Sequence, residues 1–140
     1  MDMCKAIVIG SKGVNALGLI RSLGERKFDV TFMSTYSKIE SKYTKGYLKL
    51  PDNRKKWLAL LQKYGQTSKE KVGMFPTDDD TAFWLDENYE ALQEYFIVPH
   101  AEGKMRTLAD KSVMNEIAKK AELSVPNFIK LSLAESERKN

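Results

Sequence analysis

The chain has 140 residues, of which 42% are hydrophobic and 30% are charged, and it carries a formal net charge of +4. This is the composition of an ordinary soluble protein, and the length suits one domain, or one domain and the start of another. A single cysteine, Cys4, excludes a disulfide framework and a cysteine zinc site, and a single histidine, His100, removes most metal and triad schemes. The apolar run in "MDMCKAIVIG" is too short for a signal peptide or a membrane span, so we expect a cytoplasmic protein.

The first third of the chain predicts two strands joined by a helix. Residues 5–10, "KAIVIG", form a continuous apolar run that ends in glycine, which is typical of a strand buried on both faces of a parallel sheet. Residues 11–28 predict a helix, with apolar side chains at helical spacing at Val14, Leu17, Ile20 and Leu23. Residues 29–34 are rich in β-branched and aromatic residues and predict the second strand. We expect a loop at residues 35–46 and a short strand at residues 47–51.

The middle of the chain continues this alternation. Asp52 or Asn53 is placed to cap a helix that ends at Gly65. The apolar face of that helix comprises Trp57, Leu58, Leu61 and Tyr64. "KVGMFPT", residues 71–77, predicts a third main strand, and "FIVP", residues 96–99, predicts a fourth.

A further helix is expected between these two strands, over residues 78–96. Thr77 and Asp80 have the spacing of a capping box at its start. Its buried side chains are expected to be Phe83, Leu85, Tyr89 and Leu92. Because strands and helices alternate, the sequence predicts an α/β fold of the Rossmann-like, doubly wound kind, with a parallel sheet and helices on both faces.

In such a sheet, ligands bind beyond the carboxyl ends of the strands, where two loops of this sequence are expected. The first, "GSKGVNALG", lacks the spacing of a dinucleotide fingerprint, and no acidic residue ends the second strand to bind a ribose, so a bound NAD is disfavoured. The second, "PTDDD", places three carboxylates at a helix start, where they complement the helix dipole. An amine or Mg²⁺ facing these acids is the functional alternative, and His100 is interpreted as an exposed or hydrogen-bonded loop residue.

A basic stretch and a later helix could each contact phosphate. Residues 36–56 are rich in lysine, which we interpret as a solvated rim rather than a phosphate or nucleic-acid surface, since no RNA-binding motif lies nearby. A helix is predicted over residues 110–121, with Asp110 as its cap. Lys111 then occupies the first helical position, where its charge opposes the helix dipole. That arrangement arises by chance, or where a lysine and free helix N–H groups both face a polyphosphate.

Three segments, taken in order, resemble the opening of ATP-grasp ligases: "IGSKGVNALGLIRSLG", "FPTDDDTAFWLDEN" and "LADKSVMNEIAKKAELSVPNF". The sequence is most similar to the carboxylate–amine ligases related to the large subunit of carbamoyl-phosphate synthase. The resemblance implies a pre-ATP-grasp Rossmann-like domain over residues 1–100. Residues 101–140 would then be a linker and the start of a truncated ATP-grasp domain.

The resemblance also implies roles for five residues. Lys111 matches the lysine that reaches the nucleotide phosphates, and Gly10, Ser11, Thr77 and Asp79 match positions that line the substrate cleft. The sequence departs from the family pattern where Lys27 and Glu122 stand at helix ends that usually carry glycine, and where Ser124 replaces a common proline. A left-handed residue other than glycine at such an end costs about 1–2 kcal/mol.

The remaining ATP-site groups of the family would lie beyond residue 140, so the resemblance implies a fragment that is inactive by itself. ATP and Mg²⁺ would act in the full-length parent and would not bind tightly to this chain. The implied partners are small-molecule carboxylate and amine substrates, with a second copy in a homodimer as a further option, and with no nucleic acid and no membrane. The alternative is a small Rossmann-like or flavodoxin-like nucleotide-binding or regulatory module.

Overall fold

The computed structural model describes residues 4–127 and divides the chain into two compact units. The first unit ends at Met105, whereas the sequence analysis expected a boundary at residue 100, and the second unit begins at Arg106. The first unit contains the whole sheet and four helices. None of the helices described is both long and apolar enough to cross a lipid bilayer.

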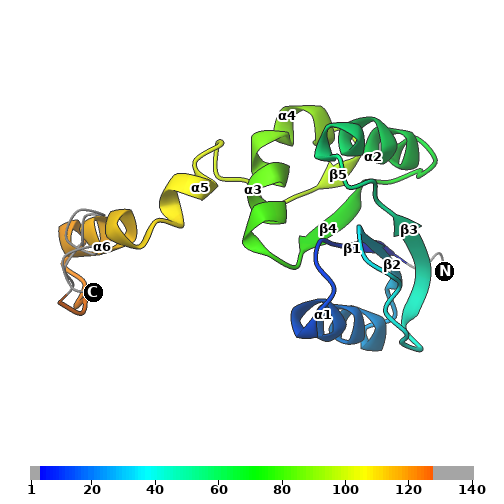
Figure 1. The fold of residues 1–140 in the computed structure, drawn as a ribbon, viewed down its shortest axis with the longest axis horizontal. Coiled ribbons are helices and arrows are strands. Elements are labelled where there is room, and N and C mark those ends of the chain that lie inside the picture. The colour runs from blue at the N-terminus through cyan, green and yellow to red at the C-terminus, as the bar shows by residue number, and fades with distance from the viewer. Residues whose placement is uncertain (1–3, 128–140) are drawn as a thin grey trace, which may run out of the picture. The chain divides into compact units, whose positions relative to one another are not determined.

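The first unit is built on one five-stranded sheet in which all strands are parallel (Figure 1). The strands are β1 (Lys5–Ile9), β2 (Asp29–Ser34), β3 (Thr44–Lys49), β4 (Val72–Pro76) and β5 (Phe96–Ile97). Their order across the sheet is β3-β2-β1-β4-β5, so the chain moves outward from β1 first to one side and then to the other. This confirms the predicted Rossmann-like, doubly wound α/β fold.

Helices cover both faces of the sheet, with α1 on one face and α2, α3 and α4 on the other (Figure 1). Their bounds are α1 (Val14–Glu25), α2 (Trp57–Gly65), α3 (Asp79–Glu87) and α4 (Tyr89–Leu92), and the short 3₁₀ helix η1 (Arg54–Lys56) precedes α2. Asn53 caps this start by accepting a hydrogen bond from the Lys55 backbone N–H, as predicted. Helix α2 ends at Gly65, also as predicted.

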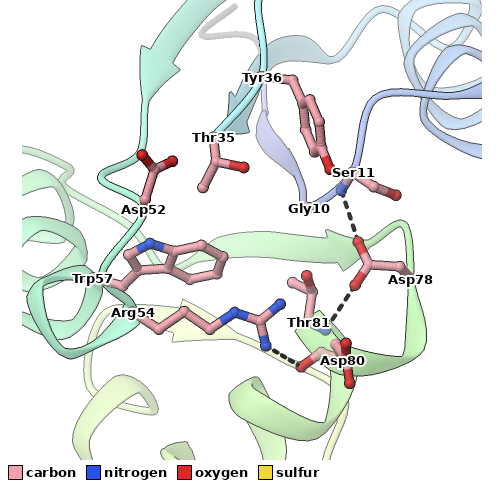
Figure 2. Close-up of a pocket in the computed structure, with 10 residues that line it drawn as sticks. All are labelled: Gly10, Ser11, Thr35, Tyr36, Asp52, Arg54, Trp57, Asp78, Asp80 and Thr81. Carbon is pink, nitrogen blue, oxygen red and sulfur yellow. Dashed lines mark hydrogen bonds between the residues drawn. The ribbon is translucent and has the colours of Figure 1, made fainter.

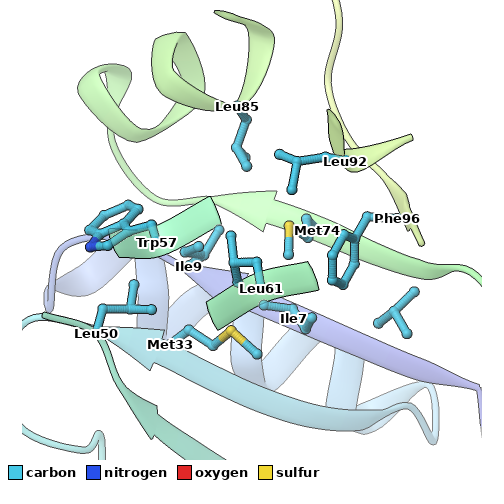
Figure 3. Packing of buried hydrophobic residues seen from close by; sticks show 11 residues of the cluster. Ile7, Ile9, Met33, Leu50, Trp57, Leu61, Met74, Leu85, Leu92 and Phe96 are labelled. Carbon is cyan, nitrogen blue, oxygen red and sulfur yellow. The ribbon is translucent and has the colours of Figure 1, made fainter. Parts of the chain in front are cut away.

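The core has two layers because the side chains of β1 alternate between the faces of the sheet. Ile7 and Ile9 belong to the larger cluster, beside α2, α3 and α4, and Val8 belongs to the smaller cluster, beneath α1. Figure 3 shows the larger cluster, in which Leu61 of α2 and Leu85 of α3 pack toward the central strands. The strand predicted from the first apolar run is therefore buried on both faces, as expected.

The edge strand β3 begins at Thr44, so the prediction of a loop through residue 46 was wrong at its end. The segment that the analysis missed, Thr44 to Gly46, has no apolar alternation, and its Lys45 is exposed. It pairs with β2 through an irregular register beside Thr31. Backbone pairing at a sheet edge does not require the apolar pattern from which a strand is predicted.

The single helix predicted over residues 78–96 is interrupted, and its cap differs from the predicted one. Asp78 caps α3 by accepting the Thr81 backbone N–H, so the Thr77–Asp80 capping box was wrong. Asn88 ends α3, because its side-chain Nδ2 donates to the Trp84 carbonyl oxygen at 2.8 Å. Of the side chains predicted to be buried, Leu85 and Leu92 are, while Phe83 and Tyr89 are half-buried.

The second unit contains α6 (Lys111–Lys120), and α5 (Met105–Leu108) spans the division between the units. Asp110 caps α6 by accepting the Ser112 and Val113 backbone N–H groups, and Lys111 is the first helical residue, both as predicted. No side chain of α6 is buried among the described residues. Lys111 itself is exposed.

Both helix ends at which the sequence lacks an expected glycine adopt left-handed backbone. Lys27 after α1 has φ 65° and Glu122 after α6 has φ 57°. After α1, the Lys27 N–H donates to the Gly24 carbonyl and the Phe28 N–H donates to the Leu23 carbonyl, which is a Schellman motif. The same pair of hydrogen bonds closes α6, so the cap geometry is that of a glycine cap with another residue in it.

We therefore expect Lys27→Gly to stabilise the protein by about 1 kcal/mol, because glycine adopts the left-handed conformation without steric cost. The gain is smaller than the full steric term, since glycine also increases the entropy of the unfolded chain. The measurement is the free energy of unfolding in urea. Lys27→Ala removes the same long side chain but keeps the Cβ atom and should give no gain; equal effects of the two substitutions would contradict the explanation.

Candidate functional site

The main pocket of the first unit lies at the carboxyl ends of the strands, where the connections from β1 and β4 diverge to opposite sides (Figure 2). This is the topological switch point at which open parallel sheets bind ligands. The pocket has a volume of about 430 Å³, within the range of small-molecule sites. Its walls are formed by Gly10, Ser11, Thr35, Tyr36, Asp52, Arg54, Trp57, Asp78, Asp80 and Thr81.

The loop after β1 forms one wall, and the Asp78 carboxylate holds it. The Ser11 backbone N–H donates to Asp78 Oδ2 at 2.7 Å, and the Thr81 backbone N–H donates to Oδ1 at 2.9 Å. Burial alone would raise the pKa of Asp78, but the hydrogen bonds from Ser11 and Thr81 outweigh burial and place the pKa below its ordinary value. Asp78 is therefore a charged bridge between the loop after β1 and the start of α3.

Gly10 allows this bridge to form. Its φ is +129°, a conformation that other residues rarely adopt. A Cβ atom at this position would lie 2.5 Å from both Asp78 Oδ2 and Thr77 Oγ1. The Gly10 carbonyl accepts a hydrogen bond from Ser34 Oγ at 2.6 Å, so β2 also fixes the loop.

The Asp78 bridge has a chemical consequence for phosphate binding. In a dinucleotide site, backbone N–H groups of this loop and of the helix that follows it hold a phosphate. Here the Ser11 N–H already donates to a carboxylate, whose negative charge would repel a phosphate. The geometry agrees with the absence of a dinucleotide fingerprint in the sequence.

The opposite wall contains an arginine whose guanidinium lies over a tryptophan ring (Figure 2). The Arg54 guanidinium carbon lies 5.2 Å from the centre of the Trp57 ring, and Nη1 donates to the Asp80 backbone carbonyl at 3.0 Å. Trp57 is buried; its Nε1 donates to the Pro51 carbonyl at 2.7 Å, and its ring meets Trp84 edge-on at 5.4 Å. Arg54 thus has a fixed platform, in contrast to a freely rotating surface arginine.

The five residues predicted to form the site lie in different places in the structure. Gly10 and Ser11 line the pocket. Thr77 is buried and does not line it, but its Oγ1 donates to the Ser11 carbonyl at 3.0 Å and so supports the wall. Asp79 is exposed and outside the lining, between Asp78 and Asp80, which both belong to it. Lys111 belongs to the second unit.

The sequence analysis missed Asp52, Arg54 and Trp57 as site residues. Their segment was interpreted as a helix cap and a helix face, which is correct but incomplete. A usable signal was present, because Asp52 follows a strand and therefore lies at the same sheet edge as the other two loops. As to metals, no group of three or more His, Cys, Asp and Glu residues within residues 4–127 is arranged to hold an ion.

A second feature, at the end of the first unit, was also missed. The Asp86 side chain is buried, with Oδ1 accepting the Ala101 backbone N–H at 2.6 Å and Oδ2 accepting the Met105 backbone N–H at 2.9 Å. His100 Nδ1 lies 3.1 Å from Oδ1, and its ring stacks on Tyr89 with the ring centres 3.7 Å apart. Burial would raise the pKa of Asp86, but these hydrogen bonds outweigh it and lower the pKa.

Asp86 therefore fixes the loop from His100 to Met105, in which Glu102 and Gly103 both have positive φ. The predicted hydrogen-bonded loop histidine is found in this cluster.

No family model matches this chain, and no curated protein matches it.

Proposed function

We propose that this chain is the N-terminal domain of an ATP-grasp carboxylate–amine ligase and that its pocket contributes to the substrate cleft. One observation carries the proposal. Two of the three segments that resemble the family, one beginning at residue 9 and one at residue 75, meet in a single pocket at the switch point of the sheet. Gly10 and Ser11 come from the first segment, and Asp78, Asp80 and Thr81 come from the second.

The third segment supports the proposal through α6. Asp110 caps this helix, and Lys111 is exposed at its first position, as the resemblance requires of a lysine that reaches nucleotide phosphates. Lys111 destabilises its own helix, because its positive charge opposes the helix dipole. A phosphate partner in the full-length parent would account for a lysine at that position.

In such a parent, ATP and Mg²⁺ would activate a substrate carboxylate as an acyl phosphate, which an amine then attacks. We expect that residues 4–127 do not form an ATP site by themselves. The main pocket has an acidic lining, and its loop N–H at Ser11 already donates to Asp78. The role left to this chain is to bind and orient a substrate, and the nucleotide chemistry is assigned to residues outside it.

The proposal predicts that the purified chain has no magnesium-dependent ATPase activity and binds ATP, NAD and FMN weakly or not at all. Colorimetric phosphate release and isothermal titration calorimetry are the measurements. Turnover that Lys111→Ala abolishes would contradict the proposed fragment. Tight binding of NAD or FMN would instead favour the alternative, a small Rossmann-like or flavodoxin-like module, which the engaged Ser11 N–H already disfavours.

The natural reading frame provides an independent and positive test. The proposal expects the coding sequence to continue past Asn140 for about two hundred residues, roughly one or two domains, with the missing nucleotide-site groups in it. A gene that stops at Asn140 and whose product is active in its cell would overturn the proposal.

A further inference from the structure

The Arg54 guanidinium is the cationic group of the main pocket, and it has no acidic partner. No carboxylate among the described residues lies within 4.0 Å of it, and its one hydrogen bond goes to a backbone carbonyl. The Trp57 ring and the Asp80 carbonyl hold the guanidinium in place, and its other N–H groups remain available in the pocket (Figure 2). A planar guanidinium with free N–H donors matches the geometry of a carboxylate.

The acidic side chains of the pocket differ in whether they already accept hydrogen bonds from the protein. Asp78 is engaged by two backbone N–H groups, so it belongs to the wall. The side chains of Asp52 and Asp80 are exposed and accept no hydrogen bond from any described residue. Asp52 lies across the Trp57 ring from Arg54, whereas Asp80 lies on the same side of the ring as Arg54 (Figure 2). The Asp80 carboxylate is therefore available to a cationic group of a ligand bound at Arg54.

The formal charge of the lining further restricts the class of ligand that the pocket can bind. Three aspartates and one arginine give the lining a formal net charge of −2. A purely anionic ligand such as a nucleotide phosphate meets net repulsion there, and a plain amine leaves the fixed guanidinium unpaired. A ligand that carries both a carboxylate and an ammonium group can pair with Arg54 and with Asp80.

We infer that this pocket binds a small zwitterion of the amino-acid type, with its carboxylate on Arg54 and its ammonium group on Asp80. The inference rests on the proposed function for the identity of the pocket as a substrate site. It adds the chemical class of the substrate and names Arg54 as the residue that selects the carboxylate. Trp57 is a positioning residue, since it acts through Arg54.

The test begins with a panel of L- and D-amino acids added to the ¹⁵N-labelled chain, with binding followed by NMR. We expect at least one to shift the backbone signals of Ser11, Tyr36 and Thr81. Each amino acid that binds is compared with its two single-charge analogues; for alanine these are propionate, which lacks the amine, and ethylamine, which lacks the carboxylate. Both analogues should bind at least about tenfold more weakly, because each leaves one set of charges unpaired.

Matched variants then locate the two charges. Arg54→Gln should weaken zwitterion binding by about tenfold or more, whereas Lys55→Gln, the same change of charge at the next residue and outside the pocket, should change it less than about twofold. Asp80→Asn should weaken binding, and Asp79→Asn, at an exposed neighbour outside the lining, should not. Preserved NMR dispersion in each variant shows that the fold is intact.

The inference is overturned if no amino acid of the panel shifts the pocket signals, if an analogue binds as well as the zwitterion, or if Arg54→Gln and Lys55→Gln behave alike. None of these results bears on the reading frame or on NAD and FMN binding, which test the proposed function. A failure of the substrate class can thus be told apart from a failure of the ligase assignment.

Discussion

Gly10→Ala is expected to lower the free energy of unfolding by about 4 kcal/mol, the larger of the two main stability effects predicted here. Two causes contribute. The φ of +129° at Gly10 is strained for any residue with a Cβ atom, and that atom would lie 2.5 Å from Asp78 Oδ2 and from Thr77 Oγ1. These neighbours hold the loop after β1, so they cannot move aside without breaking the hydrogen bonds to Ser11.

Urea denaturation followed by circular dichroism measures this effect, and Gly18→Ala is its control. Gly18 lies within α1, is exposed and has open space around the position of a Cβ atom. The same chemical change should there stabilise the protein by about 0.5–1 kcal/mol, because alanine favours helix. A Gly10→Ala variant as stable as the wild type would show that the loop is not held as described.

Asp86→Ala is expected to lower the free energy of unfolding by about 3 kcal/mol, since it removes a buried carboxylate and leaves the partly buried N–H groups of Ala101 and Met105 without their acceptor. The loop that ends the first unit then loses the side chain that fixes it. Thermal or urea unfolding gives the measurement. Glu94→Ala removes the same charge from an exposed position and should change stability by less than about 0.5 kcal/mol; equal losses in the two variants would contradict the role of Asp86.

The pH dependence of this effect has a definite sign. Because the pKa of Asp86 is lower in the folded protein, its carboxylate contributes stability above the unfolded pKa of about 3.9. That contribution is lost as the pH falls through the lower folded value. The difference in unfolding free energy between wild type and Asp86→Asn should therefore be constant above about pH 5 and shrink as the solution becomes more acidic. A difference that grows in acid would rule out the lowered pKa.

The sequence predicted the fold well because β1, α1 and α2 carry strong and local patterns. The apolar run through Ile7 to Ile9, the Asn53 cap and the Gly65 end all depend on neighbours within a few residues. The departures at Lys27 and Glu122 were also informative, since both residues have the left-handed backbone that a glycine there would have. In each case the neighbouring residues were sufficient to predict the local backbone structure.

The failures have a different physical origin. Thr77 and Asp78 are both acceptable helix caps, and the choice of Asp78 depends on the Ser11 N–H, 67 residues away in sequence. The same holds for Asp86, whose burial is explained only by the backbone of residues 101–105, and for Arg54, whose orientation depends on Asp80. The residue pattern of one segment cannot reveal partners that lie far away in the sequence.

The position of β1 at the centre of the sheet affects how this protein forms during synthesis. Ile7 of β1 pairs with Met74 of β4, and the larger cluster also includes Phe96 of β5. Strand β1 therefore cannot complete its pairing and packing until β4 and β5 have been synthesised. Pairings so distant in sequence slow folding and leave an apolar strand edge open meanwhile. A nascent chain that stops on the ribosome before β4 would expose that edge, and we expect it to be a client of chaperones.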